Sequence, residues 1–136
     1  MDRSKEASTI ALAFLGDSIY EFFVRDRLME GPIASVSHAD RLHRAAVRYV
    51  CAAAQAASLA AISDELTEQE TALVKRARNH RIATKPKNTD AVTYKQATAF
   101  EALLGWLWLR GDRERAAALM EEAALFTESG KEEIKE

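Results

Sequence analysis

The sequence predicts a single all-α domain, and three observations support this. Its 136 residues are enough for one compact domain with a buried core. Alanine occupies 26 positions, whereas 5 glycines and 2 prolines leave few turns, which favours close-packed helices over a β-sandwich or barrel. Apolar residues recur at helical spacing rather than at every second position. We therefore expect a bundle of five helices.

The first helix is expected over residues 9–29. Ser8 or Thr9 is its candidate N-cap, and Gly31-Pro32 ends the pattern. Its apolar positions share the spacing of one helix face: Leu12, Leu15, Ile19, Phe22 and Phe23. The helix should therefore be long and amphipathic.

The second helix, over residues 37–62, has an alanine-rich half that carries almost no charge. This composition predicts a central place in the bundle, with Cys51 as a small buried side chain. The third helix covers residues 67–78. Thr67 begins it and Glu70 stands three residues later, which is the spacing of a capping box.

Residues 79–90 have no helical period and are expected to form an exposed loop. A fourth helix follows over residues 91–110, with Thr89 or Asp90 as its N-cap. A fifth helix covers residues 113–126, and the charged tail 128–136 is expected to be flexible. We expect residues 1–136 to form one domain.

The composition also bears on location. The single Cys51 cannot form an internal disulfide, which suits a reducing cytoplasm. We expect no apolar run of membrane-spanning length, and the N-terminus lacks the apolar core of a signal peptide. A cytoplasmic protein without a membrane partner is the expectation.

The net charge of −2 hides a basic block. Residues 75–95 hold seven lysines and arginines against Asp90 alone, a local charge of +6. Such an asymmetry is typical of proteins with a polyanionic partner, although a solvated loop explains a charge cluster equally well.

Two acidic residues occupy positions that helices do not ordinarily favour. Asp17 follows Gly16 in the middle of the first helix, where each residue type costs about 0.5–1 kcal/mol. Glu101 stands alone in an apolar stretch, with Gly105 one turn away. Glycine lets another backbone or a substrate approach closely, so the two carboxylates have room to converge on one hard cation, with Mg²⁺ preferred. The alternative for Asp17 is an ordinary charged residue on the solvent-exposed face of the helix.

These motifs resemble a known family. Residues 11–21, ALAFLGDSIYE, are similar to the signature helix of the ribonuclease III catalytic domain, and residues 100–105, FEALLG, to its second acidic motif. The order RN, PKNTD, TY and ATAFE over residues 78–101 resembles the Mini-ribonuclease III branch, which has no separate domain for binding double-stranded RNA. The resemblance covers nearly the whole chain and implies a homodimeric helical bundle.

The resemblance assigns roles to particular residues. Asp17 matches the family's signature aspartate, and Glu101 matches its metal-ligand glutamate. Ala13 and Thr98 replace two further carboxylates of full-length members, as in the Mini branch, so the expected metal site keeps two of four acids. Thr98 and Glu21 are expected to support the two ligands, although a purely structural role suits Glu21 equally well.

The implied activity is Mg²⁺-dependent hydrolysis of double-stranded RNA that leaves 5′-phosphate and 3′-hydroxyl ends, on the precursor of large-subunit (23S) ribosomal RNA. A ribosomal protein or an assembling subunit is a candidate partner. Residues in and beside the loop would grip the RNA backbone: Arg78, Arg81, Lys85, Lys87 and Asn88. Candidate dimer-interface residues share the first helix: Phe14, Ile19, Phe22 and Phe23.

Two other classes of function stay open. A non-catalytic RNA-binding or ribosome-associated module on the same fold would explain the lost carboxylates but not the retained Asp17 and Glu101. A helical adaptor for other proteins would explain the amphipathic helices, but neither the acids beside glycine nor the basic block.

Overall fold

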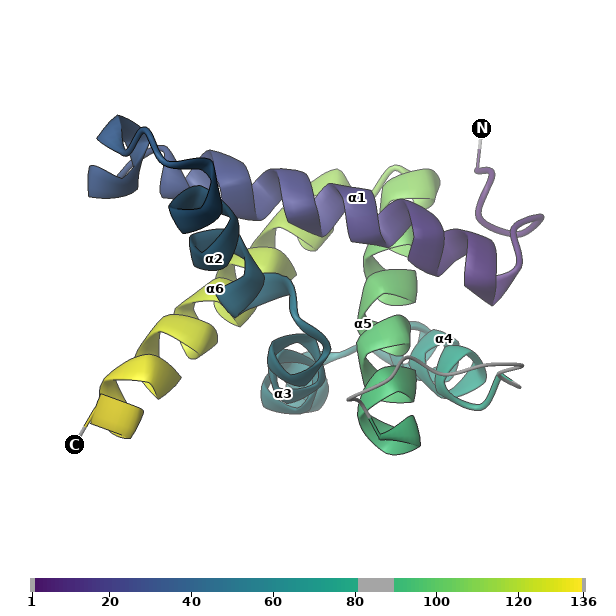
Figure 1. Cartoon of the computed structure of the whole chain (residues 1–136). Helices are drawn as coiled ribbons and strands as arrows, with labels where there is room; N and C mark the ends of the chain where they lie inside the picture. The colour runs from purple at the N-terminus through teal and green to yellow at the C-terminus, as the bar shows by residue number, and fades with distance from the viewer. Residues whose placement is uncertain (1, 81–89, 136) are drawn as a thin grey trace.

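The computed structural model describes residues 2–80 and 90–135, with side chains as far as Gly130. Helices account for all the regular structure in these ranges, which confirms the all-α prediction (Figure 1). The α-helices are α1 (Thr9–Leu28), α2 (Ala39–Val50), α3 (Ala52–Ile62), α4 (Glu68–Arg78), α5 (Ala91–Arg110) and α6 (Arg113–Lys135). Two short 3-10 helices, η1 (Pro32–Ser35) and η2 (Ser63–Glu65), lie between them.

Helix α5 is the centre of the molecule. In Figure 1, α1 crosses its upper part, while α3 and α4 lie on either side of its lower part. Its buried residues face several directions: Ala97, Ala99, Phe100, Ala102, Leu103, Leu104, Gly105 and Leu107. The sequence assigned the central place to the alanine-rich residues 51–61, and this was wrong. Helix α3 covers one side of α5 instead, and also packs on α6.

The predicted helix caps are confirmed. The Ser8 hydroxyl accepts a hydrogen bond from the backbone N–H of Ala11, and Thr67 forms a capping box with Glu70. The Asp90 carboxylate accepts from the backbone N–H of Thr93, which fixes the start of α5. Each side chain satisfies a backbone donor that has no partner inside the helix.

The second predicted helix is broken at Cys51, which has the extended angles φ −66° and ψ 157°. The break separates α2 from α3, and Cys51 is exposed there rather than buried as predicted. By length and composition, Ala39–Glu65 is apolar enough to cross a membrane, with a mean hydropathy of 1.4 in its best window. The prediction that no apolar run reaches membrane-spanning length was therefore wrong. The break and the packing of α3 on α5 and α6 fit part of a folded domain.

Helix α6 continues to Lys135 instead of ending near Phe126. The predicted tail begins at Glu128, and this residue is held in place. Its carboxylate accepts hydrogen bonds from the Nε of Arg27 at 2.8 Å and from the hydroxyl of Tyr49 at 2.7 Å. The α6 helix is thereby tied to α1 and α2. The flexibility of the residues after Gly130 stays a prediction.

Candidate active site

The two predicted glycines lie where α1 crosses α5. A Cβ atom added to Gly16 would overlap the backbone carbonyl of Glu101, and one added to Gly105 would overlap the backbone carbonyl of Leu12. Each glycine therefore receives the backbone of the opposite helix. This confirms the expectation that glycine permits a close approach at these positions. The group that approaches each glycine is the backbone of the other helix rather than a substrate.

The crossing brings Asp17 and Glu101 together, as the sequence predicted. Asp17 is exposed, whereas Glu101 is half-buried beside it. The two carboxyl groups are close enough to share a hydrogen bond. Because Gly16 contacts the backbone of Glu101 and Asp17 is the next residue, the close helix packing itself sets this proximity.

The protonation of Glu101 is strongly perturbed. Burial raises its pKa to about 8, and the Asp17 carboxylate adds to the rise through charge repulsion and a hydrogen bond. At neutral pH, Glu101 therefore carries a proton when nothing else compensates the charge. A carboxyl group whose pKa is raised this far by burial and by a neighbouring carboxylate is typical of a functional site.

Gln55 on α3 is a third member of this site. Its side-chain amide lies beside the Glu101 carboxyl and acts to lower the pKa of that group. Gln55 is 2% exposed, so its amide is held by the surrounding core. Sequence reasoning missed this residue. The available signal was a single amide in the stretch AAAQAAS, the same kind of anomaly that pointed to Glu101.

The donor set fits a hard divalent cation. The two carboxylates supply oxygen atoms, which Mg²⁺ prefers as ligands. A cation between Asp17 and Glu101 would also offset the burial and the repulsion by Asp17 that together keep Glu101 protonated. Among the described residues, no cluster of three or more His, Cys, Asp or Glu side chains surrounds a point, so the protein supplies at most a sparse ligand set here.

The other predicted site residues differ in position. Thr98 is half-buried on α5, one turn before Glu101. Glu21 lies one turn after Asp17, but its carboxylate pairs with the Nε of Arg25 at 3.1 Å. Glu21 therefore has its partner on its own helix. Among the described residues, no hydrogen bond or ion pair joins Glu21 to Glu101. Its expected support of the metal site stays a prediction.

The expected RNA-binding residues are only partly described. Arg78 is half-buried in the last turn of α4. The remaining predicted contacts, Arg81, Lys85, Lys87 and Asn88, lie outside the described residues.

The expected dimer residues divide into two groups. Phe14 and Phe22 are 80% and 72% exposed on α1, and Ile10 on the same helix is 57% exposed. Ile19 and Phe23 instead pack against the core of their own chain.

Comparison with known proteins decides the family. The model of the ribonuclease III domain matches residues 10–112. The chain belongs to the ribonuclease III family. It is 46% identical over 121 residues to the Mini-ribonuclease 3 of Symbiobacterium thermophilum, covering 89% of this chain and 91% of that one. The corresponding values for the Mini-ribonuclease 3 of Brevibacillus brevis are 42% over 119 residues, 88% and 87%.

A solved structure agrees with this assignment. A Fusobacterium nucleatum protein of known crystal structure superposes with a TM-score of 0.76 at 29% identity, covering 86% of this chain and 91% of its own. The chain is therefore a ribonuclease III-type endoribonuclease of the Mini-ribonuclease 3 kind. The matched residues 10–112 include all of α5 and all but the first residue of α1, and therefore both Asp17 and Glu101.

Proposed function

We propose that this protein is a Mg²⁺-dependent endonuclease of double-stranded RNA. The observation that carries the proposal is the pairing of Asp17 and Glu101 at the α1–α5 crossing. Burial and repulsion disfavour the charged form of Glu101, and a bound cation would offset both. The family and the Mini-ribonuclease 3 relatives support the reaction class.

In this proposal, Asp17 and Glu101 hold the ion, and Gln55 keeps the Glu101 side chain oriented toward Asp17. Glu101 must release its proton when the ion binds, because its pKa of about 8 leaves it neutral at pH 7. When bound there, Mg²⁺ would supply an activated water and would stabilise charge on the attacked phosphate and the leaving 3′ oxygen. Cleavage would leave 5′-phosphate and 3′-hydroxyl ends.

The working unit in this proposal is a homodimer. Phe14 and Phe22 are largely exposed in a single chain, which therefore gains nothing from their apolar surface. Together with Ile10 they form an apolar face on α1. A second copy is the occupant that suits this face, because two symmetric sites would then cut the two strands of one duplex and leave a short 3′ overhang.

The proposed substrate is the precursor of large-subunit ribosomal RNA in the cytoplasm, with a ribosomal protein or an assembling subunit presenting it. The basic residues 78–88 would contact the phosphate backbone, because duplex RNA is recognised mainly through shape and charge. A non-catalytic RNA-binding module is the competing function. The acid pair weighs against it, since binding alone gains nothing from two mutually repelling carboxylates.

The test is cleavage of a defined RNA duplex in Mg²⁺, with the products mapped on both strands. Wild type should cut both strands, whereas Asp17→Asn and Glu101→Gln should lose cleavage while remaining folded. A wild-type protein that binds the duplex without cutting it would establish the non-catalytic alternative.

A further inference from the structure

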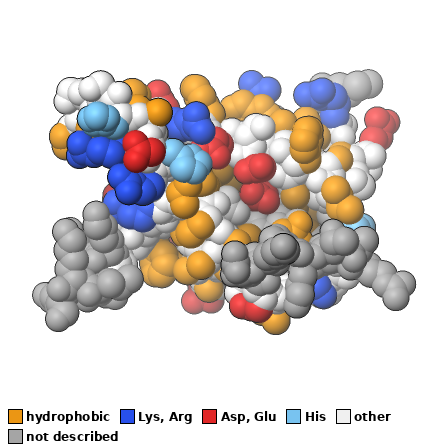
Figure 2. Space-filling view, viewed as in Figure 1, with side chains coloured by type: hydrophobic (Ala, Val, Ile, Leu, Met, Phe, Trp, Pro, Cys, Tyr) orange, Lys and Arg blue, Asp and Glu red, His pale blue; other side chains and the backbone are white. Residues whose placement is uncertain are grey.

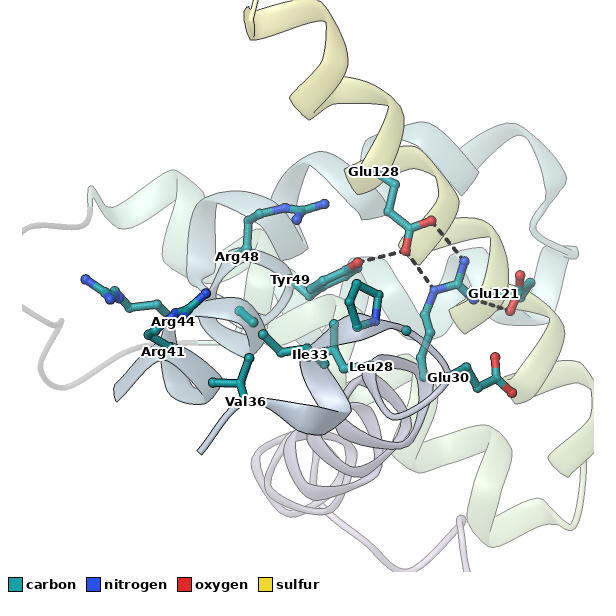
Figure 3. Close-up of a pocket in the computed structure, with 14 residues that line it drawn as sticks. Leu28, Glu30, Ile33, Val36, Arg41, Arg44, Arg48, Tyr49, Glu121 and Glu128 are labelled. Atoms are coloured by element: carbon teal, nitrogen blue, oxygen red, sulfur yellow. Dashed lines mark hydrogen bonds and ion pairs between the residues drawn. The ribbon is translucent and has the colours of Figure 1, made fainter. Parts of the chain in front are cut away.

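Two hollows in the described part of the protein differ in the charge of their walls. The larger one, of about 960 Å³, lies between the end of α1, η1, α2 and α6. Figure 3 shows Arg41 and Arg44 on one side of this hollow, and Glu30, Glu121 and Glu128 on the other. A small anion inside it would meet the carboxylates, so the walls of this hollow do not select an anion.

The smaller hollow has the size and the apolar lining of a ligand site. It has a volume of about 520 Å³ and lies between the N-terminal segment, α4 and the last turns of α5. Apolar side chains from all three segments contribute to its lining: Ala7, Ala72, Leu73 and Trp106. Hollows of this size with partly apolar walls are typical of sites for small organic molecules.

The polar part of this lining is positively charged. Lys5, Arg76 and Arg110 line the hollow, and Asp2 is the one acidic residue among the described residues that do so. Lys5 and Arg76 form no ion pair within the described part of the chain. Arg110 pairs with Asp112 at 3.3 Å, but the Asp112 side chain is 47% exposed, so water screens the pair. The hollow therefore favours a ligand that carries negative charge.

The Arg110 guanidinium is held in a fixed plane at this site. It lies 4.3 Å from the centre of the Trp106 ring, and its Nη1 donates a hydrogen bond to the Oε1 of Gln69 at 3.1 Å. A guanidinium stacks on flat rings, and Trp106 occupies only one of its two faces. The opposite face of Arg110 is left for a second flat ring.

We propose that this hollow binds a nucleoside 5′-monophosphate. The base stacks on the Arg110 guanidinium, and the phosphate pairs with Lys5 and Arg76. An inorganic anion would leave the apolar lining unused, and an uncharged ring would leave the cations without a partner. Two sources offer this chemistry, a free nucleotide and the 5′-phosphorylated end of an RNA strand.

The proposed site is separate from the acid pair. Its lining includes neither Asp17 nor Glu101. Figure 2 shows acidic side chains in the middle of the viewed face, near the α1–α5 crossing. Without a metal ion these carboxylates disfavour a phosphate, so binding in the absence of metal reports on the hollow rather than on the acid pair.

The test is calorimetric titration of the full chain with adenosine and guanosine 5′-monophosphates, in buffer without divalent metal. Adenosine alone and inorganic phosphate alone should bind about tenfold more weakly or worse, because each uses only half of the site. Arg110→Lys keeps the charge but removes the flat platform, and should lower the affinity by about tenfold. Arg76→Gln removes an exposed cation from α4 and should also lower it by about tenfold. If Arg110→Lys does not fold, as judged by circular dichroism, Arg76→Gln carries the test.

Arg113→Lys is the matched control. Arg113 lies 4.3 Å from the centre of the Trp108 ring in the same kind of stack, but neither residue lines the hollow. This variant should bind the nucleotide like wild type. An equal loss of affinity in the control would overturn the proposal, as would the absence of nucleotide binding by wild type at about 1 mM. Inorganic phosphate that binds as tightly as the nucleotide would overturn it too, because the apolar lining would then play no part.

Competition with a short RNA duplex distinguishes the two sources. A duplex with 5′-phosphates that displaces the nucleotide, when the same duplex with 5′-hydroxyl ends does not, would identify an RNA end as the ligand. A free nucleotide is the ligand if neither duplex displaces it. Displacement by both would place the nucleotide on a general phosphate-binding surface and overturn the proposed site. The proposed function is tested separately by cleavage in Mg²⁺, so its failure would leave these binding results standing.

Discussion

At the scale of single residues, Glu101 should make stability depend on pH. Its pKa is about 8 in the folded chain against 4.5 as a free group, so folding favours the protonated form. Without divalent metal, this contribution is complete below pH 4.5 and is lost as pH rises through 8. Wild type should therefore lose stability on the order of a few kcal/mol from pH 5 to pH 9, and Glu101→Gln should not. Thermal unfolding across this pH range measures the difference.

A surface carboxylate provides the control for that experiment. Glu21→Gln removes an acid from the same face, but its partner Arg25 is exposed, so the change should cost no more than about 1 kcal/mol at any pH. If wild type and Glu101→Gln lose stability in parallel as the pH rises, burial of the Glu101 carboxyl is not the source of the dependence.

Gln55 carries the second prediction at this scale. Gln55→Leu removes the amide that lowers the pKa of Glu101, so that pKa should rise and metal should bind less readily. Cleavage by this variant should require more Mg²⁺, and its pH–rate profile should move to higher pH. Titration of activity with Mg²⁺ at several pH values checks both effects. Loss of activity without a change in the pH profile would mean that Gln55 serves packing alone.

At the scale of elements, the α1–α5 crossing is the critical contact. Gly16→Ala places a Cβ against the backbone carbonyl of Glu101, and a backbone cannot move aside as a side chain can. Overpacking of this kind typically costs 1–3 kcal/mol or more, and here it also separates Asp17 from Glu101. Denaturant unfolding and duplex cleavage should therefore both be impaired.

Gly130→Ala is the matched control, because a Cβ there meets no atom within 4 Å and Gly130 also lies inside a helix. Alanine should stabilise that helix by up to about 1 kcal/mol. Equal stability of the Gly16 and Gly130 variants would contradict the proposed role of the crossing.

The helix caps could be predicted from the sequence, whereas the break between α2 and α3 could not. Caps at Ser8, Thr67 and Asp90 act on their own helix, so local sequence was sufficient to predict them. The break at Cys51 has no glycine or proline to mark it, so local sequence did not indicate it.

Part of the candidate site, too, could be predicted from the sequence. Asp17 and Glu101 stood out because each conflicts with its local setting, and the adjacent glycines indicated a close approach. The contribution of Gln55 depends on how α3 packs against α5, which no pattern in α3 specifies. Gln55, a partner from a third helix with no glycine beside it to indicate a close approach, was therefore the part of the site that sequence reasoning did not supply.

At the scale of the whole molecule, the apolar face of α1 should decide the oligomeric state. Phe14→Ser with Phe22→Ser removes two aromatic side chains that are largely exposed in the monomer, so the folded chain loses little and the dimer loses its main apolar contact. Sedimentation should then show a monomer. Since one monomer carries one acid pair, duplex cleavage should change from paired cuts to single-strand nicks. Val92→Ser is the control, because Val92 is 70% exposed but lies on α5, and its loss should leave the dimer intact. A wild-type protein that sediments as a monomer while cutting both strands would remove the dimer from the proposed mechanism.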